Sequence, residues 1–166
     1  MIWNFGDLDP GHRGETGTRF AVVAVPLERT TSYGKGAAGG PAAIVEASRY
    51  LELFDEQYGI QAADEGIWTV EPFLSDAETL DRNLHLIYSK SADLLKSGKF
   101  LVFAGGEHSM TPPVVRAYLE RYPNLSVLQF DAHADLRPEY EGTPFSHACA
   151  MRRVVESCPV VEVVCS

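Results

Sequence analysis

Positive charge, cysteine and long apolar runs are all scarce in this 166-residue chain, and each scarcity excludes a class of protein. Lys and Arg number 14 against 23 Asp and Glu, so the formal net charge is −9. Binding of nucleic acid needs clustered positive charge to neutralise phosphates, so we expect no nucleic-acid partner. No apolar run approaches the roughly 20 residues that a membrane helix needs, so we expect no membrane partner either.

The three cysteines, Cys149, Cys158 and Cys165, all lie near the end of the chain. An odd number of cysteines without a C-x-x-C pair predicts neither a disulfide framework nor a structural zinc site. The first residues, Met1–Asp7, lack the basic and apolar regions of a secretory signal peptide. Together these features favour a protein of the cytoplasm.

Apolar segments of two kinds alternate along the chain. Short apolar runs predict strands, and apolar residues spaced by three and four predict helices. The predicted strands cover residues 19–26, 67–70, 100–104, 125–130 and 160–164, and the predicted helices cover about ten residues from Pro41, then 76–97, 111–122 and 147–156. Residues 1–18 are expected to form an extended lead-in. Alternating strands and helices predict a single α/β domain over residues 1–166, with three layers and a mainly parallel sheet.

Side chains that bind metal ions follow the strand predicted at 125–130. Asp131, His133 and Asp135 alternate along the chain directly after this apolar run, which we expect to be buried. Alternate side chains of an extended segment share a face, so the three groups can converge on one point. The carboxyl edge of a parallel sheet is also where α/β proteins place their chemistry. Oxygen and imidazole ligands together suit Mn, Fe(II) or Zn, although solvated turn residues would give the same pattern.

Two further histidines lie near predicted strand ends. Gly105–Gly106 separates a predicted strand from His108, and two glycines permit a tight turn and a close approach of the backbone. We therefore expect His108 at the same sheet edge as Asp131. His147 follows later in the chain, where a purely structural histidine at the start of a helix is the alternative to a functional one.

Six stretches of the chain together resemble the ureohydrolase family, and within it the agmatinases more than the arginases. They occur in the family's order and cover most of the chain: Pro26–Gly34, Gly39–Ile44, Leu51–Asp55, Gly105–Ser109, Phe130–Asp135 and Ser146–Arg153. The resemblance implies an arginase-like α/β fold that holds two manganese ions at the carboxyl ends of its strands. It also implies a homo-oligomer that hydrolyses a cationic guanidino compound. Agmatinases convert agmatine to putrescine and urea, a step of polyamine biosynthesis.

The same resemblance implies a role for each candidate residue. His108, Asp131 and Asp135 resemble the ligands of one manganese ion. Asp131 also bridges to a second ion in the family, and His133 helps to bind that ion. His147 falls where the family has a catalytic histidine outside the metal shell, which transfers protons.

Two neighbours of these residues are expected not to act directly. The family carries Asp or Glu at the position of Glu107, and we expect this side chain to support His108 rather than to bind an ion. Cys149 lies two residues after His147. Neighbouring residues of a helix face different directions, so we expect no Cys–His nucleophile here.

Hydrolysis of a guanidinium group explains why these residue types are needed. The guanidinium carbon is a poor electrophile, and water at neutral pH is a poor nucleophile. Two metal ions about 3.5–4 Å apart can share one water molecule and lower its pKa toward neutrality. The departing amine leaves well only when it is protonated, and a histidine that titrates near pH 7 can deliver that proton.

The family's remaining metal ligands, two aspartates of a later Asp-x-Asp segment, have no match in this chain. No aspartate follows Asp135. The later carboxylates lie in no matching motif: Glu139, Glu141, Glu156 and Glu162. A glutamate that holds the guanidinium group near the family's C-terminus is also absent. The chain therefore resembles the N-terminal part of a ureohydrolase nearly twice as long, and we expect an incomplete domain, impaired turnover and an unpaired edge strand at Val160–Val164.

Several alternatives stay open. The chain is a natural truncation, a frameshifted product or a partial sequence. It is also compatible with a non-catalytic module that holds one metal ion or none and acts by association with another chain. A different substrate is the third alternative, as in arginase, guanidinobutyrase or formimidoylglutamase.

Overall fold

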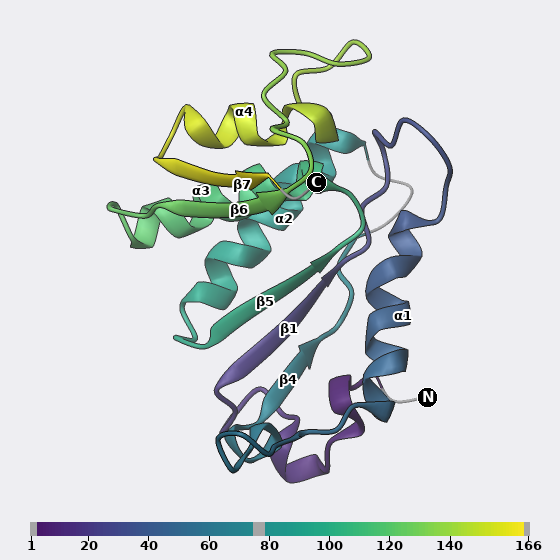
Figure 1. The fold of residues 1–166 in the computed structure, drawn as a ribbon, viewed down its shortest axis with the longest axis vertical. Helices are drawn as coiled ribbons and strands as arrows, with labels where there is room; N and C mark the ends of the chain where they lie inside the picture. Colours follow the sequence, from purple (N-terminus) through teal and green to yellow (C-terminus); the bar gives the residue numbers. More distant parts are fainter. Residues whose placement is uncertain (1–2, 75–78, 165–166) are drawn as a thin grey trace.

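The structure is a computed structural model that describes residues 3–74 and 79–164 (Figure 1). Three parallel strands form its main sheet in the order β4-β1-β5: β1 Phe20–Val25, β4 Ile67–Val70 and β5 Phe100–Gly105. A second parallel pair joins β6 Val127–Asp131 to β7 Val160–Val164. A short antiparallel hairpin, β2 Phe54–Asp55 with β3 Ile60–Gln61, was not predicted. The prediction of a mainly parallel sheet is confirmed.

Four α-helices connect these strands: α1 Gly40–Ala47, α2 Leu80–Leu95, α3 Thr111–Arg121 and α4 Ala150–Val155. The start predicted for the second helix, at residue 76, lies outside the described residues. α2 begins at Leu80, where the Thr79 hydroxyl accepts a hydrogen bond from the Arg82 N–H at 3.3 Å and so caps the helix. None of the helices within residues 3–74 and 79–164 combines the length and the apolar character that a membrane crossing requires.

Different parts of the chain cover the two faces of β1. Alternate side chains of a strand point to opposite faces, and Val23 packs with Ile87 of α2 and Ala117 of α3. Val22 points the other way and packs with Leu8 of the N-terminal segment. α1 contacts that segment as well as β1 and β5, and so completes the second side. The three-layer arrangement is therefore confirmed for this part of the fold.

The N-terminal segment differs from the extended lead-in that we expected. It contains two short 3-10 turns, Phe5–Asp7 and Pro10–His12, and buries Asn4 and Leu8. The Asn4 side-chain amide donates a hydrogen bond to the Leu8 carbonyl oxygen at 2.8 Å. The prediction was wrong because polar, glycine-rich residues here fold over an apolar sheet face that would otherwise meet water.

Helices cover only one face of the β6–β7 pair. Met151 and Val154 of α4 pack with Leu119 of α3, and against them lie Val127 and Val160 from the two strands. The opposite face exposes large apolar side chains: Leu128, Phe130, Val161 and Val163. The prediction that strand 125–130 is buried was therefore wrong for half of its side chains. A parallel strand is fully buried only when both faces are covered.

The outer edges of the two parallel sheets meet no strand among the residues that the structure describes. β5 pairs with β1 on one edge, and β6 pairs with β7 on one edge, but β5 and β6 do not pair with each other. Phe100 and Val102 of β5 are exposed, Phe100 to 64%. The two strands converge at their carboxyl ends and diverge at their amino ends (Figure 1). The free edge of β7 was predicted, and the free edges of β4, β5 and β6 are additional.

A close contact between backbones positions the segment that follows β5. The Gly106 N–H donates to the Val25 carbonyl oxygen at 3.0 Å, and a Cβ atom at this position would clash with the Leu27 backbone. The prediction of a close backbone approach is confirmed for Gly106. Neither Gly105 nor Gly106 takes a left-handed φ, so the turn itself does not require glycine.

We expect Gly106→Ala to lower the free energy of unfolding by about 3 kcal/mol, because the clashing neighbour is backbone and cannot rotate away. Urea unfolding followed by circular dichroism measures the change. Gly11→Ala is the control, since a Cβ atom there meets nothing within 4 Å. Similar losses in the two variants would contradict the explanation.

Candidate metal centre

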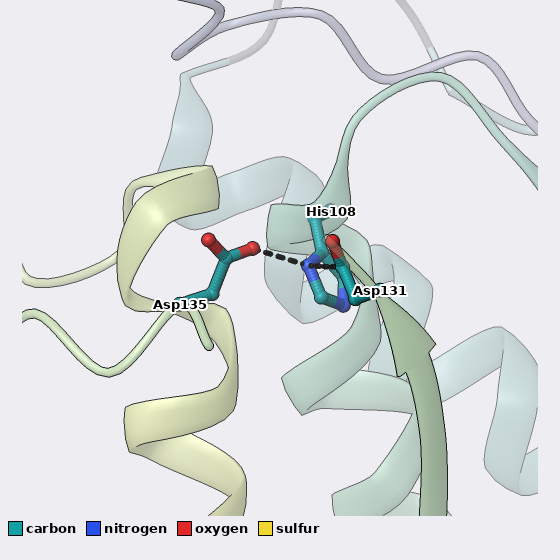
Figure 2. Close-up of side chains that lie close together, drawn as sticks. All are labelled: His108, Asp131 and Asp135. Atoms are coloured by element: carbon teal, nitrogen blue, oxygen red, sulfur yellow. Dashed lines mark hydrogen bonds and ion pairs between the residues drawn. The ribbon is translucent and has the colours of Figure 1, made fainter. Parts of the chain in front are cut away.

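Three metal-ligand side chains meet beyond the carboxyl ends of β5 and β6 (Figure 2). His108 begins a 3-10 turn after β5, Asp131 is the last residue of β6, and Asp135 lies in the following loop. One ligand atom from each of the three lies within 4.8 Å of the others. The His108 Nδ1 atom is 2.7 Å from an Asp135 carboxylate oxygen and 3.8 Å from an Asp131 carboxylate oxygen. Within residues 3–74 and 79–164 this is the only such group of three.

A bend in the chain brings Asp131 and Asp135 together. β6 ends at Asp131, the backbone bends at 132–133, and Asp135 takes a left-handed conformation with φ 48°. Aspartate tolerates this region better than most residues, but it still stores about 1 kcal/mol of strain. The Arg152 N–H of α4 donates to the Asp135 carbonyl oxygen at 3.0 Å and holds the residue there. The prediction of an extended segment after β6 was therefore wrong, although two of the three side chains, those of Asp131 and Asp135, still converge.

His133 lies near this group but outside it. Its Nδ1 atom is 3.9 Å from an Asp131 carboxylate oxygen, and its side chain is 83% exposed. The oxygen of Asp131 near His133 is Oδ1, whereas the oxygen near His108 is Oδ2. The two carboxylate oxygens of Asp131 thus lie toward different histidines. A metal-binding role for His133 stays a prediction.

Hydrogen bonds favour the ionised form of Asp131. The His133 N–H donates to the carboxylate at 3.0 Å and is the main cause that lowers the pKa of Asp131 below its ordinary value. The buried Gln129 amide, which donates at 3.3 Å, and the nearby His108 lower this pKa further, against the opposing effect of burial. A carboxylate must be ionised to bind a cation, so this environment suits a divalent ion.

Glu107 connects the loop that follows β1 to the turn that carries His108 through hydrogen bonds. Its buried carboxylate accepts hydrogen bonds from the N–H groups of Arg29 and Thr30, both at 2.8 Å. It also accepts from the hydroxyl groups of Thr30 at 2.9 Å and Ser109 at 2.6 Å. These four hydrogen bonds occupy the carboxylate, in agreement with the expectation that Glu107 supports His108 rather than binding an ion.

His147 lies beside the same loop and is not one of the three grouped ligands. It begins the 3-10 turn His147–Cys149, and its backbone N–H donates to the Thr30 hydroxyl oxygen at 2.9 Å. The ring Nδ1 is 3.3 Å from that oxygen, and the ring Nε2 is 3.3 Å from the Ser32 hydroxyl oxygen. The Tyr140 ring lies edge-on to the imidazole, with 5.7 Å between the ring centroids. The imidazole is therefore held by neutral groups.

Glu28 shapes the loop after β1 and was not predicted from the sequence. The Glu28 carboxylate accepts hydrogen bonds from the N–H groups of Gly36 and Ala38, each at 3.0 Å. The N–H of Ala38 is the main cause that lowers the pKa of Glu28 below its ordinary value. An acidic residue just before a glycine-rich run was the available signal, because such a run offers many unpaired backbone N–H groups.

Cys149 is unsuited to act as a nucleophile here. Its side chain is completely buried, and burial raises the pKa of the thiol. The thiolate is the reactive form, so a thiol kept protonated is inert. The expectation that His147 and Cys149 form no catalytic pair agrees with this geometry.

These features define a class of protein: a parallel α/β fold with metal-ligand types of side chain at the ends of its strands. Residues 18–165 match the Arginase family, and the chain belongs to that family. Its expected family and arginase-like fold are thereby confirmed.

Named relatives support this assignment. The chain is 42% identical over 142 residues to the N(1)-aminopropylagmatine ureohydrolase of Synechocystis sp., covering 81% of this chain and 46% of that protein. It is 35% identical over 135 residues to the agmatinase of Bacillus subtilis, covering 81% and 47%. The structure of the agmatine ureohydrolase of Thermoplasma volcanium matches with a TM-score of 0.81 at 27% identity, over 95% of this chain and 52% of that one. The chain thus spans about half the length of the relatives it matches and corresponds to the N-terminal portion of the family fold.

We expect the chain to bind Mn²⁺ through the three grouped side chains. Asp135→Asn should weaken this binding at least about tenfold, because an amide lacks the charge of a carboxylate. Isothermal titration calorimetry gives both the affinity and the number of ions bound. Asp64→Asn removes an exposed carboxylate outside the group and should bind like the unaltered chain. Equal losses in both variants would show that the acidic surface, and not this group, binds the ion.

Proposed function

We propose that the residues of this chain are built for an agmatinase-like hydrolysis, in which a linear guanidino compound such as agmatine yields urea and an amine. The observation that carries the proposal is the group of His108, Asp131 and Asp135 at the strand ends of an arginase-family fold. The formal charge of −9 supports a cationic substrate, because an acidic protein attracts cations through its long-range field.

Manganese is the ion that we propose for this site. Its preference for carboxylate oxygen and imidazole nitrogen fits a set of two aspartates and one histidine. His108, Asp131 and Asp135 would hold one ion, while Asp131 and His133 would contribute to a second. The orientation of Asp131, with one oxygen toward each histidine, supports a bridging role. When bound, divalent ions lower the pKa of water toward neutrality and stabilise negative charge that develops during hydrolysis.

His147 is the residue that we propose for proton transfer. It lies outside the metal group, and neutral hydroxyl groups of Thr30 and Ser32 surround its ring nitrogens. A histidine outside the metal group can act as a general acid and supply the proton that the departing amine requires. The second ion would have only Asp131 and the exposed His133 from this chain, so we expect weak turnover.

The names of the relatives support a class of substrate but do not identify a particular compound. The relatives include an agmatinase and an N(1)-aminopropylagmatine ureohydrolase, whose names share an agmatine unit. We propose that the chain acts on this shared guanidino end. Arginine, guanidinobutyrate and formimidoylglutamate remain alternative substrates.

The measurement that tests the proposed function is urea release from agmatine and from N(1)-aminopropylagmatine in the presence of Mn²⁺. We expect slow release that stops when a chelator removes the metal. His108→Ala should abolish it, because one of three grouped ligands is lost. Asp64→Asn should leave it unchanged. No detectable release, or release that survives both the chelator and His108→Ala, would overturn the proposal.

A second candidate function is association with another chain, and the uncovered apolar faces favour it. Phe100, Leu128, Phe130 and Val161 are all exposed, and β5, β6 and β7 each have an edge without a strand partner in the described structure. Exposed apolar faces and open sheet edges promote pairing between chains. We propose that the chain forms a homo-oligomer through this surface.

We expect sedimentation velocity to detect self-association that Phe130→Lys weakens, because a charge would be buried in the contact. Phe130 is 67% exposed in the single chain, so the substitution should not disturb the fold. Tyr50→Lys is the control, since Tyr50 is an exposed aromatic residue in the 3-10 turn after α1 and away from this surface. A chain that stays monomeric at every concentration would contradict the association candidate.

The cytoplasm is the location that we propose. Cys149 and Cys158 are both free and buried, which suits a compartment that keeps thiols reduced. Fractionation of cells that express the chain tests this assignment.

A further inference from the structure

We propose that Glu107 determines which ring nitrogen of His147 carries the hydrogen, and that it does so through the hydroxyl group of Thr30. The arrangement selects the tautomer with hydrogen on Nδ1 and leaves a lone pair on Nε2. This inference concerns the resting side chains and holds whether or not the chain turns over a substrate. Its meaning for proton transfer rests on the proposed function.

The first step is the direction of the hydrogen bond between Thr30 and Glu107. The Glu107 side chain is only 7% exposed and accepts two backbone N–H groups, which can act only as donors. An ionised carboxylate has no hydrogen to give, so the Thr30 hydroxyl at 2.9 Å must donate to it. A hydroxyl group has one hydrogen, and at Thr30 the carboxylate uses it.

The second step follows from what remains on the Thr30 oxygen. Only lone pairs are left, and one of them accepts the backbone N–H of His147 at 2.9 Å. The same oxygen lies 3.3 Å from the His147 Nδ1 atom. Two lone pairs would repel each other at this distance, so the contact is favourable only when Nδ1 carries a hydrogen.

The opposite side of the ring permits this assignment. The Ser32 hydroxyl lies 3.3 Å from Nε2, but its one hydrogen also has the Tyr140 hydroxyl oxygen as an acceptor at 3.1 Å, so it points at a bare Nε2 only when Tyr140 donates to Ser32 in turn. Two groups therefore compete in favour of hydrogen on Nε2. Ser32 competes when it donates to Tyr140, and Ser146 competes because its oxygen lies 3.2 Å from Nδ1 and could donate there instead. The Thr30 oxygen opposes that arrangement, since it cannot supply a hydrogen of its own.

The selected tautomer is the unusual one. The free imidazole of histidine in water favours hydrogen on Nε2, so the surroundings of His147 would reverse the ordinary preference. Nε2 would then be the atom that accepts and returns a proton. Glu107 and Thr30 act as positioning residues in this scheme, because neither of them touches the reacting atoms.

Long-range ¹H–¹⁵N NMR of the His147 ring tests the proposal, because the two ring nitrogens have different ¹⁵N shifts in the two tautomers. The spectrum is recorded at about pH 8.5, where an ordinary imidazole is neutral. We expect hydrogen on Nδ1 in the unaltered chain. Hydrogen on Nε2 in this spectrum would overturn the proposal without any variant.

Two substitutions at Thr30 isolate its oxygen atom. Thr30→Val keeps the shape and removes the oxygen, so the ratio of the Nδ1–H to the Nε2–H form should fall about 2- to 10-fold, as expected for the loss of one hydrogen bond. Thr30→Ser keeps the hydroxyl and should retain the tautomer. Thr31→Val alters the adjacent threonine, whose hydroxyl accepts from the Lys35 ammonium group, and should change nothing at His147.

Glu107→Gln provides an independent variant of the same volume. Its amide can donate to the Thr30 oxygen, which frees the Thr30 hydrogen to point at Nδ1, so we expect the tautomer to change to Nε2–H. An unchanged tautomer in both Thr30→Val and Glu107→Gln would overturn the proposal. Failure of urea release with the Nδ1–H tautomer intact would count against the proposed function and leave this inference standing.

Discussion

The distance between β5 and β6 depends on α3, because no strand pairing joins the two sheets within the described structure. α3 contributes Ala117 to the core beneath the β4-β1-β5 sheet and Leu119 to the core beneath β6 and β7. One helix thus packs against both sheets with two different faces. His108 enters the candidate metal centre from the β5 side and Asp131 from the β6 side, so the closeness of these two ligands is a consequence of helix packing. The hydrogen bond from α4 to Asp135 adds a second restraint on the same group.

Buried and half-buried carboxylates organise the glycine-rich loop beside this centre. Glu107 and Glu28 each accept backbone N–H groups from the loop that follows β1, although that loop has little regular structure. Hydrogen bonds to an ionised acceptor are stronger than those between neutral groups, so they can hold a loop that lacks a hydrophobic anchor. The same loop carries Thr30 and Ser32 to the ring of His147. Carboxylates in this chain therefore hold the loop as well as forming part of the candidate metal centre.

The exposed faces of β5, β6 and β7 belong to the strands beside the candidate metal centre. The chain spans about half the length of its arginase-family relatives, and its second helix layer covers only the β4-β1-β5 sheet. Apolar residues such as Phe130 remain in contact with water, and Asp131 has only one further histidine, His133, on its far side. The two proposed functions, hydrolysis and association, would both involve this part of the molecule, and the number of metal ions bound per chain distinguishes them.

Local elements and the residue chemistry of the candidate site could be predicted from the amino-acid sequence. Apolar runs and their spacing identified β1, β4, β5, β6 and β7 with only small errors at their ends, because these patterns are local. His108, Asp131 and Asp135 could be named as candidate ligands because the carboxyl ends of parallel strands share one edge. Their residue types, and the order of the matching stretches, also indicated the family.

Which faces are covered and which side chains meet depends on the packing of distant segments, which no local pattern contains. Leu128 and Phe130 have the composition of a buried strand, yet they are exposed because nothing in the described structure packs on their side. Asp135 contacts His108 because its backbone is left-handed, which the alternation of side chains in an extended strand does not predict. The same departure from an extended backbone leaves His133 outside the group. The series of contacts from Glu107 through Thr30 to His147 joins residues far apart in sequence. It exists only once the loop after β1, the segment after β5 and the 3-10 turn His147–Cys149 are packed together. Local patterns fix what each segment can become, whereas contacts between distant segments depend on the packing of the whole chain.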